Sequence, residues 1–185
     1  MLKQKKMRHS FIGAFCCFLL LGAAGQAWAH TNVQVPIDDP WHVVKSKFDG
    51  DRASLIEWAP GNQTVENWKE LVSLGTFVTT KPAELLARAV KIAERSVAKF
   101  KVLRQTPDEV LLEVATPVGQ HGEPAEYGLR RLFLNAEGMY YIEYASKVPL
   151  SPPVKAKWVK FLTETKAVAS GADGNSPYDR VVNAP

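Results

Sequence analysis

The chain has 185 residues, of which 46% are hydrophobic and 23% are charged, the size and composition of one ordinary folded domain. It carries 23 basic and 19 acidic residues, for a formal net charge of +4, and only two cysteines. A scaffold held together by several disulfide bonds is therefore excluded.

The first 29 residues have the pattern of a secretory signal peptide. A basic start precedes an apolar run from Phe11 to Leu21, and Ala27-Trp28-Ala29 is a small-residue cleavage signal. The apolar run is shorter than the roughly 20 residues that a membrane-spanning helix needs. We therefore expect cleavage after Ala29, a periplasmic or secreted protein, and no stable membrane span in the processed chain.

The 156 residues that remain after removal of this segment differ in composition from the full chain. Both cysteines, Cys16 and Cys17, lie within the signal, so the processed chain would have no thiol. The signal also holds four basic residues and no acidic ones, and subtracting them leaves 19 of each sign. A neutral domain lacks the basic excess typical of nucleic-acid binding, and we expect no nucleic-acid partner.

The first strands are predicted from short apolar segments between turn residues. After an extended lead-in from His30 to Pro40, the residues Trp41–Phe48 and Ala53–Trp58 are typical of two strands. Asp49-Gly50-Asp51 between them favours a hairpin turn.

The stretch Trp68–Phe77 fits two kinds of element. Trp68, Leu71, Val72 and Gly75 follow a helical spacing, whereas Trp68, Glu70, Val72 and Leu74 follow the alternation of a strand. The Gly-Thr-Phe-Val-Thr-Thr end favours the strand, and the periodicity alone leaves both alternatives open.

The clearest helix is predicted over Pro82–Phe100. Its apolar residues recur at spacings of three and four and so share one face. Thr80 is the predicted N-cap, and Pro82 suits the first turn, where no backbone N–H is needed.

Four further strands follow this helix. They are Lys101–Gln105, Val110–Thr116, Tyr127–Leu134 and Met139–Lys147. Asn135–Gly138 favours a hairpin turn between the last two. Because Arg130 and Arg131 alternate across their strand, one must face the less exposed side, and we expect it to pair with Glu143 or another acid.

A last helix is predicted from Pro152 to about Lys166, with Ser151 as its N-cap. From Ala167 the chain is small, polar and punctuated by glycine and proline, which is typical of a disordered tail. The sequence therefore predicts one α+β domain over residues 30–166. Its order is β-β-β-α-β-β-β-β-α, with two helices on an antiparallel sheet.

Two segments resemble a family of small secreted proteins of Gram-negative bacteria. They are Glu57–Leu71, EWAPGNQTVENWKEL, and Leu129–Lys147, LRRLFLNAEGMYYIEYASK. The order of strands and helices also resembles the fold of the plant PsbP protein and the Mog family of Ran-binding proteins. The resemblance implies a fold and an exported location, and it implies no active site.

Histidine suggests a copper site as an alternative function. Cleavage after Ala29 would leave His30 as the N-terminus, where its amine and imidazole could bind one copper ion with His42 or His121. Histidine follows many cleavage sites by chance, and these histidines lack the spacing of a known metal motif.

No catalytic residue is assigned, because no G-x-S-x-G or H-E-x-x-H motif occurs. Glu57 and Glu70 flank one turn and could approach each other. Four aromatic residues could line an apolar groove between sheet and helix: Trp58, Trp68, Tyr127 and Tyr144. We therefore expect a non-catalytic binding or accessory protein, without a cofactor, that contacts an envelope protein or a small ligand.

Overall fold

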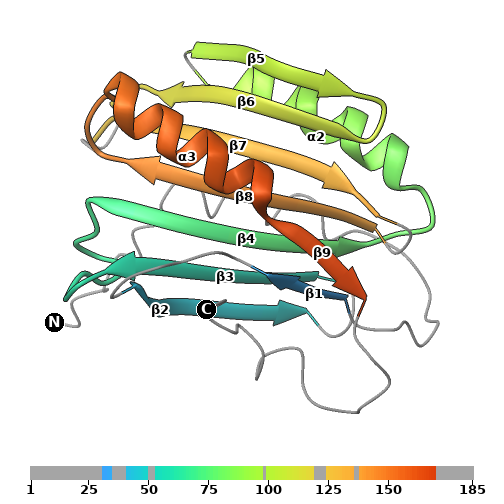
Figure 1. Cartoon of the computed structure of the whole chain (residues 1–185), viewed down its shortest axis with the longest axis horizontal. Helices are drawn as coiled ribbons and strands as arrows, with labels where there is room; N and C mark the ends of the chain where they lie inside the picture. The colour runs from blue at the N-terminus through green and yellow to red at the C-terminus, as the bar shows by residue number, and fades with distance from the viewer. Residues whose placement is uncertain are drawn as a thin grey trace, which may run out of the picture.

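The computed structural model describes residues 31–34, 41–49, 53–97, 99–118, 124–135 and 138–169. Within them, seven strands form one antiparallel sheet (Figure 1). These are β2 (Trp41–Asp49), β3 (Ala53–Pro60), β4 (Glu70–Val78), β5 (Lys99–Thr106), β6 (Glu109–Thr116), β7 (Glu126–Leu134) and β8 (Gly138–Ser146). Helix α2 (Pro82–Ser96) follows β4, and helix α3 (Pro152–Glu164) follows β8. The predicted α+β class and order of elements are confirmed.

The strands lie in the order β2-β3-β4-β8-β7-β6-β5. Helix α2 carries the chain from β4 to the far edge of the sheet, where β5 begins. Three hairpin connections then lead back to β8, which pairs with β4. The middle of the sheet therefore joins segments that are distant in the sequence.

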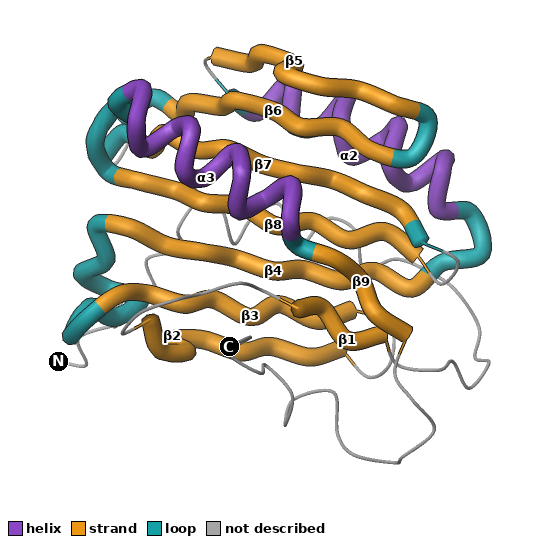
Figure 2. The backbone as a smooth tube through the Cα atoms, in the orientation of Figure 1, coloured by secondary structure: helices purple, strands orange, loops and turns teal. Residues whose placement is uncertain are grey.

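The two helices pack on opposite faces of the sheet. Figure 2 shows α3 in front of the strands and α2 behind them. Helix α3 packs on β7 and β8, while α2 packs on β5, β7 and β8. We call these surfaces the α3 face and the α2 face. Strand residues buried in the α3-face core include Trp58, Val72, Leu74, Leu111, Leu129, Phe133, Ile142 and Tyr144. Those of the α2-face core are Leu55, Phe77, Val110, Leu112, Val114, Leu132, Met139 and Tyr141.

Helix α2 begins at Pro82 as predicted and is shorter than predicted at its C-terminal end. Its N-cap is Lys81 instead of Thr80, and the Lys81 amide donates to Thr79 Oγ1 at 3.1 Å. It ends at Ser96, whose hydroxyl donates to the Ile92 carbonyl at 2.8 Å and so satisfies a carbonyl of the last turn. The apolar residue Phe100, predicted as helical, belongs to β5, because aromatic residues also suit a half-buried strand.

Helix α3 begins as predicted. Ser151 is its N-cap with extended backbone angles, and Pro152 takes the first position, although the Ser151 side chain makes no capping hydrogen bond.

The ambiguous stretch Trp68–Phe77 is mostly strand, because β4 runs from Glu70 to Val78 and pairs with both neighbours. Gly75 is needed there. A Cβ atom at Gly75 would lie 2.0 Å from Cε1 of Tyr141, whose ring covers this part of the strand. Non-local pairing with β8, which periodicity does not reveal, makes this segment a strand.

Two short strands join the ends of the domain. β1 (Thr31–Gln34) pairs antiparallel with β9 (Lys166–Ala169), and the ribbon is drawn in front of the sheet in Figure 1. The predicted tail thus begins within β9, and residues 170–185 and 1–30 lie outside the described ranges. No helix among the described residues is long and apolar enough to span a membrane.

Candidate functional site

A line of polar side chains crosses the α2 face from β2 to β7. Strand register places its members opposite one another on successive neighbouring strands. We call these five residues the polar row: Lys45, Glu57, Ser73, Glu143 and Arg130. Along each of β3, β4 and β8, the residues two positions before and after the row residue are on the same face and are apolar or glycine.

Arg130 and Glu143 form a buried ion pair at one end of the polar row. The Arg130 Nε donates to Glu143 Oε2 at 3.1 Å, and Nη2 donates to Oε1 at 3.0 Å and to Oε2 at 2.8 Å. Their side chains are only 7% and 3% exposed. The pairing predicted from strand alternation is therefore confirmed, with the forked geometry that arginine favours.

The backbone makes room for this pair at Gly128. A Cβ atom there would lie 3.0 Å from Glu143 Oε1 and 3.0 Å from the Tyr144 carbonyl oxygen. A larger residue at this position would displace the Glu143 carboxylate.

A second ion pair lies at the other end of the polar row. Lys45 Nζ is 2.9 Å from Glu57 Oε2. The Glu57 side chain is 4% exposed and the Lys45 side chain is 37% exposed, so this pair reaches solvent through its lysine at the sheet edge.

Ser73 separates the two ion pairs. It is fully buried, and its Oγ atom has no hydrogen-bond partner among the described residues. Its register neighbours are Glu57 on β3 and Glu143 on β8. A buried hydroxyl without a hydrogen-bond partner is unfavourable by about 1–3 kcal/mol.

Burial raises the pKa of Glu143 above its ordinary value. The charge and hydrogen bonds of Arg130 act in the opposite direction, whereas the negative charges of Glu126 and Glu57 raise this pKa further. The effect of burial on this pKa thus outweighs the opposing effect of Arg130.

An apolar cluster lies beside the polar row. It contains Ala59, Trp68, Leu71 and Ala145. Lys147 Nζ lies 3.7 Å from the Trp68 ring centroid and 2.5 Å from Glu126 Oε1. The surroundings of the row combine small apolar side chains, one tryptophan and further charges.

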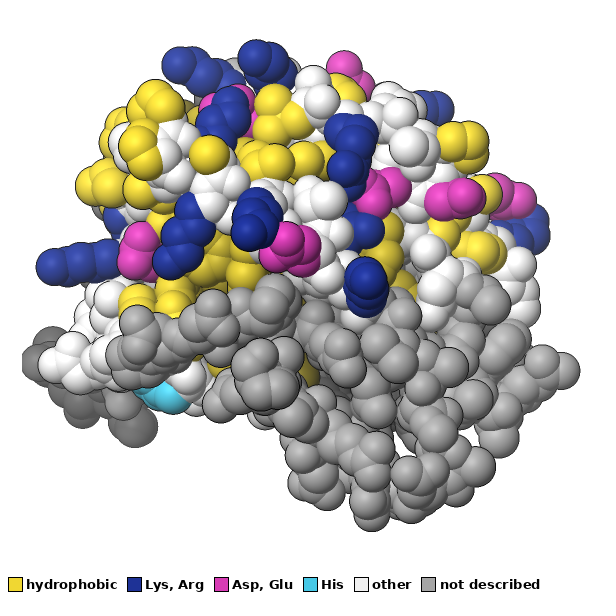
Figure 3. All heavy atoms as spheres, in the orientation of Figure 1, with side chains coloured by type: hydrophobic (Ala, Val, Ile, Leu, Met, Phe, Trp, Pro, Cys, Tyr) yellow, Lys and Arg dark blue, Asp and Glu magenta, His cyan; other side chains and the backbone are white. Residues whose placement is uncertain are grey.

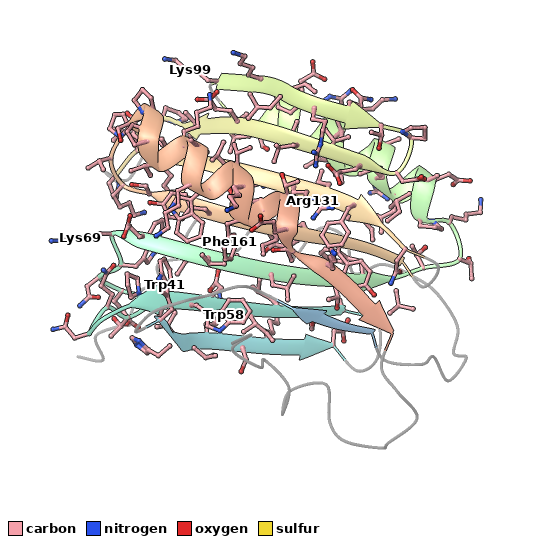
Figure 4. All side chains as sticks on the ribbon, viewed as in Figure 1. Trp41, Trp58, Lys69, Lys99, Arg131 and Phe161 are labelled. Atoms are coloured by element: carbon pink, nitrogen blue, oxygen red, sulfur yellow. The ribbon has the colours of Figure 1, made fainter. Side chains whose placement is uncertain are left out.

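The predicted groove residues do not all share one face. Trp58 and Tyr144 are buried in the α3-face core, and Figure 4 shows Trp58 on the same side of the sheet as Phe161 of α3. Tyr127 is half-buried and lies on the same face of β7 as Leu129 of that core, whereas Trp68 packs in the cluster beside the polar row. A ligand site made by these residues stays a prediction.

Tyr144 illustrates how closely the α3-face core is packed. Its ring stacks on Trp158 with centroids 4.0 Å apart, and its hydroxyl donates to Glu70 Oε1 at 2.5 Å. Burial and the Glu70 carboxylate raise the pKa of Tyr144. The suggested approach of Glu57 to Glu70 is wrong, because Glu57 lies on the α2 face and Glu70 contacts Tyr144 on the other.

The predicted metal ligands are only partly described. His42 is exposed on β2 opposite Ala59, while His30 and His121 lie outside the described residues. Among the described residues, no three His, Cys, Asp or Glu side chains gather as metal ligands. Copper binding through His30 stays a prediction.

The second arginine of β7 has a different role. Arg131 Nη1 donates to the carbonyls of Leu162 at 2.8 Å and Thr165 at 2.6 Å at the end of α3. Its Nη2 donates to Glu109 Oε2 at 2.6 Å. Figure 4 shows Arg131 beneath the end of α3, so it holds the helix terminus to the sheet.

Sequence reasoning missed Ser73 and gave Glu57 the wrong partner. The signal was present, because Ser73 and Glu143 each interrupt an otherwise apolar strand, in Leu-Val-Ser-Leu and Tyr-Ile-Glu-Tyr. Figure 3 shows the α3 face, where basic and acidic side chains are interspersed; the polar row lies on the opposite face.

Comparison of the chain with known protein families, with curated proteins and with solved structures finds no match.

Proposed function

We propose that this protein is an exported, non-catalytic binding protein and that the polar row holds a small ligand. The observation that carries the proposal is the fully buried Ser73 hydroxyl, which lacks a partner among the described residues and whose register neighbours are two buried acidic residues. Export is supported by the signal-peptide pattern of residues 1–29.

Energetics support a functional role for the polar row. A buried ion pair is often no more stabilising than well-packed apolar residues of the same volume. The neighbouring register row on the α3 face uses Trp58, Val72, Tyr144 and Leu129 instead. Apolar residues can thus fill a row across these same strands. Folding alone does not explain why the polar row on the α2 face carries buried charges.

The chemistry of the row favours binding over catalysis. Each buried carboxylate already has a cationic partner, Lys45 for Glu57 and Arg130 for Glu143. Both carboxylates are therefore already occupied by side chains of the protein itself.

The resemblance to the PsbP and Mog folds is kept as part of this proposal. It is supported by the order within the seven-stranded sheet and its helices, which is three strands, one helix, four strands and a second helix.

Replacement of the buried ion pair tests the proposal. We expect Arg130→Met/Glu143→Leu to stay folded, because both partners are replaced together by apolar residues. Native mass spectrometry after incubation with a cell-envelope extract should show a bound small molecule on the original protein and none on this variant.

The matched control is Lys81→Met/Glu84→Leu, which makes the same kind of change in an exposed pair on α2. This control should retain the bound mass. Equal occupancy of the original protein and the buried-pair variant, or no bound mass on either, would overturn the proposal.

A further inference from the structure

We infer that residues 148–152, Val-Pro-Leu-Ser-Pro, are a docking segment for a partner protein that has an aromatic-lined groove for the polyproline II conformation. The segment connects β8 to α3, and Figure 2 shows it as a loop at one end of the sheet. It contains no residue of the polar row, so this inference does not depend on the ligand proposed for that row.

The sequence of the segment limits its backbone to extended conformations. A residue that precedes proline is kept out of the helical region, and this applies to Val148 and to Ser151. Ser151 has φ −68° and ψ 156°, close to the polyproline II values of about −75° and 145°. Proline fixes its own φ at about −65°, so the ring of Pro152 continues this path although α3 begins there.

The exposure of the side chains follows the period of a polyproline II helix. This helix has about three residues per turn, so residues three apart share an edge. Pro149 and Pro152 lie along one edge, and Val148 and Ser151 lie along a second; all four are exposed. Leu150 lies on the third edge and is half-buried against the α3-face core. The fold thus anchors the segment through one leucine and presents its other two edges to solvent.

The backbone of the segment is also available to a partner. Among the described residues, the Leu150 amide and the carbonyls of Pro149 and Leu150 have no hydrogen-bond partner. The Lys147 amide, just before the segment, donates to the Lys69 carbonyl at 2.9 Å and holds this end in place. Tryptophan and tyrosine side chains of an aromatic groove carry the donors that free carbonyls need.

The side chains match what such grooves recognise. Aromatic grooves bind Pro-x-x-Pro segments, because a preformed polyproline II helix loses little conformational entropy on binding. Pro149 and Pro152 have this spacing. Val148 precedes the first of them and is 65% exposed, the largest fraction of any large hydrophobic residue that the structure describes. Burial of this side chain in a groove would stabilise a complex.

The start of α3 does not by itself explain the segment. A proline at the first helical position is common, because no backbone N–H is needed there, and this accounts for Pro152. It accounts neither for Pro149, which lies outside the helix, nor for the exposure of Val148.

Nuclear magnetic resonance titration of the full protein tests this inference. The probes are a Src-homology 3 domain and a WW domain, two purified domains whose aromatic grooves bind polyproline II segments. With at least one of them, we expect saturable shifts of the Val148, Leu150 and Ser151 amides. An excess of decaproline, which fills the groove, should abolish these shifts.

A variant without the two prolines tests the docking residues. Pro149→Ala/Pro152→Ala changes two exposed positions and places a good helix former at the start of α3, so the protein should stay folded. Its dissociation constant should rise about tenfold or more. Pro107→Ala/Pro117→Ala is the matched control, because it changes two exposed prolines outside a Pro-x-x-Pro sequence and should bind as the original protein does.

Val148→Asp is a second variant, which leaves both prolines in place. A charge on this side chain opposes its burial in an apolar pocket, so binding should again weaken about tenfold or more. Val102→Asp makes the same change at an exposed valine of β5 and should leave binding unchanged.

The absence of saturable shifts with both domains would show that the segment is not a polyproline II ligand. Equal binding by the original protein and both docking variants would show the same, as would shifts that fall only on residues outside 147–154.

Discussion

At the scale of single residues, Glu143 has the most unusual environment. It is buried, paired with Arg130 and close to the carboxylates of Glu126 and Glu57. Its pKa is raised in the folded protein, so the folded state holds a proton that the unfolded chain has already released. Stability from this group is therefore present at low pH and lost as the pH rises through the window between the two pKa values.

This linkage predicts the pH behaviour of Glu143→Gln. From about pH 4.5 upward, where unfolded glutamate ionises, the free energy of unfolding should fall less steeply with pH in this variant than in the original protein. Urea unfolding at several pH values measures this difference. Glu84→Gln, exposed on α2, should leave the slope unchanged, and an identical slope for Glu143→Gln would contradict the raised pKa.

At the scale of elements, α3 depends on a side chain from the sheet. Its last carbonyls carry the negative end of the helix dipole, and the Arg131 guanidinium satisfies two of them while also pairing with Glu109. The same guanidinium lies 4.4 Å from the Phe133 ring centroid. One residue of β7 thus fixes where α3 ends.

Arg131→Met should therefore destabilise the protein by about 2–4 kcal/mol, because it leaves buried carbonyls and Glu109 without this partner. Denaturant unfolding measures the loss, and amides of the last turn of α3 should exchange faster. Arg104→Met is the control, since Arg104 pairs with the same Glu109 but is 42% exposed. Comparable losses in both variants would argue against a role in holding α3.

Both edges of the sheet are unsuited to pairing with another chain. β2 has a register irregularity between Val43 and Lys45, and β5 has one between Val102 and Arg104. Bulges and basic side chains on edge strands hinder edge-to-edge association. These features favour contacts through the faces of the sheet over contacts through its edges.

At the scale of the whole molecule, the β1–β9 ribbon ties the two ends of the domain together. Thr31 lies opposite Ala169, and Gln34 lies opposite Lys166. β9 directly follows the end of α3, where Arg131 binds. Strand β1 therefore helps to hold β9 in place.

Asn32→Pro/Val33→Pro removes two successive amides from β1, so at least one hydrogen bond to β9 is lost. Hydrogen exchange of residues 166–169 should become about tenfold faster or more, while the central strands β4 and β8 keep their protection. Asn32→Ala/Val33→Ala retains both amides and should have little effect. Unchanged exchange in the proline variant would show that the ribbon does not hold β9.

Local patterns predicted most of the fold. The hairpin at Asn135–Gly138 sets the register of β7 against β8, which is why the Arg130–Glu143 pair could be expected from the sequence. The apolar spacing of Pro82–Ser96 predicted a helix for the same local reason. The pairing of β4 with β8 has no local signal, and so the position of Ser73 between Glu57 and Glu143 could not be foreseen.

The pairing of β4 with β8 also constrains how the molecule forms. Glu70 pairs with Ser146 and Val78 with Gly138, so the partner of β4 is synthesised last among the strands of the sheet. While the chain is being synthesised, β2, β3 and β4 can pair before β8 exists. The edge of β4 that later pairs with β8 is then unpaired, and this strand is largely apolar. Contacts so distant in sequence form slowly, and this edge is the part of the nascent protein that a chaperone has most reason to shield.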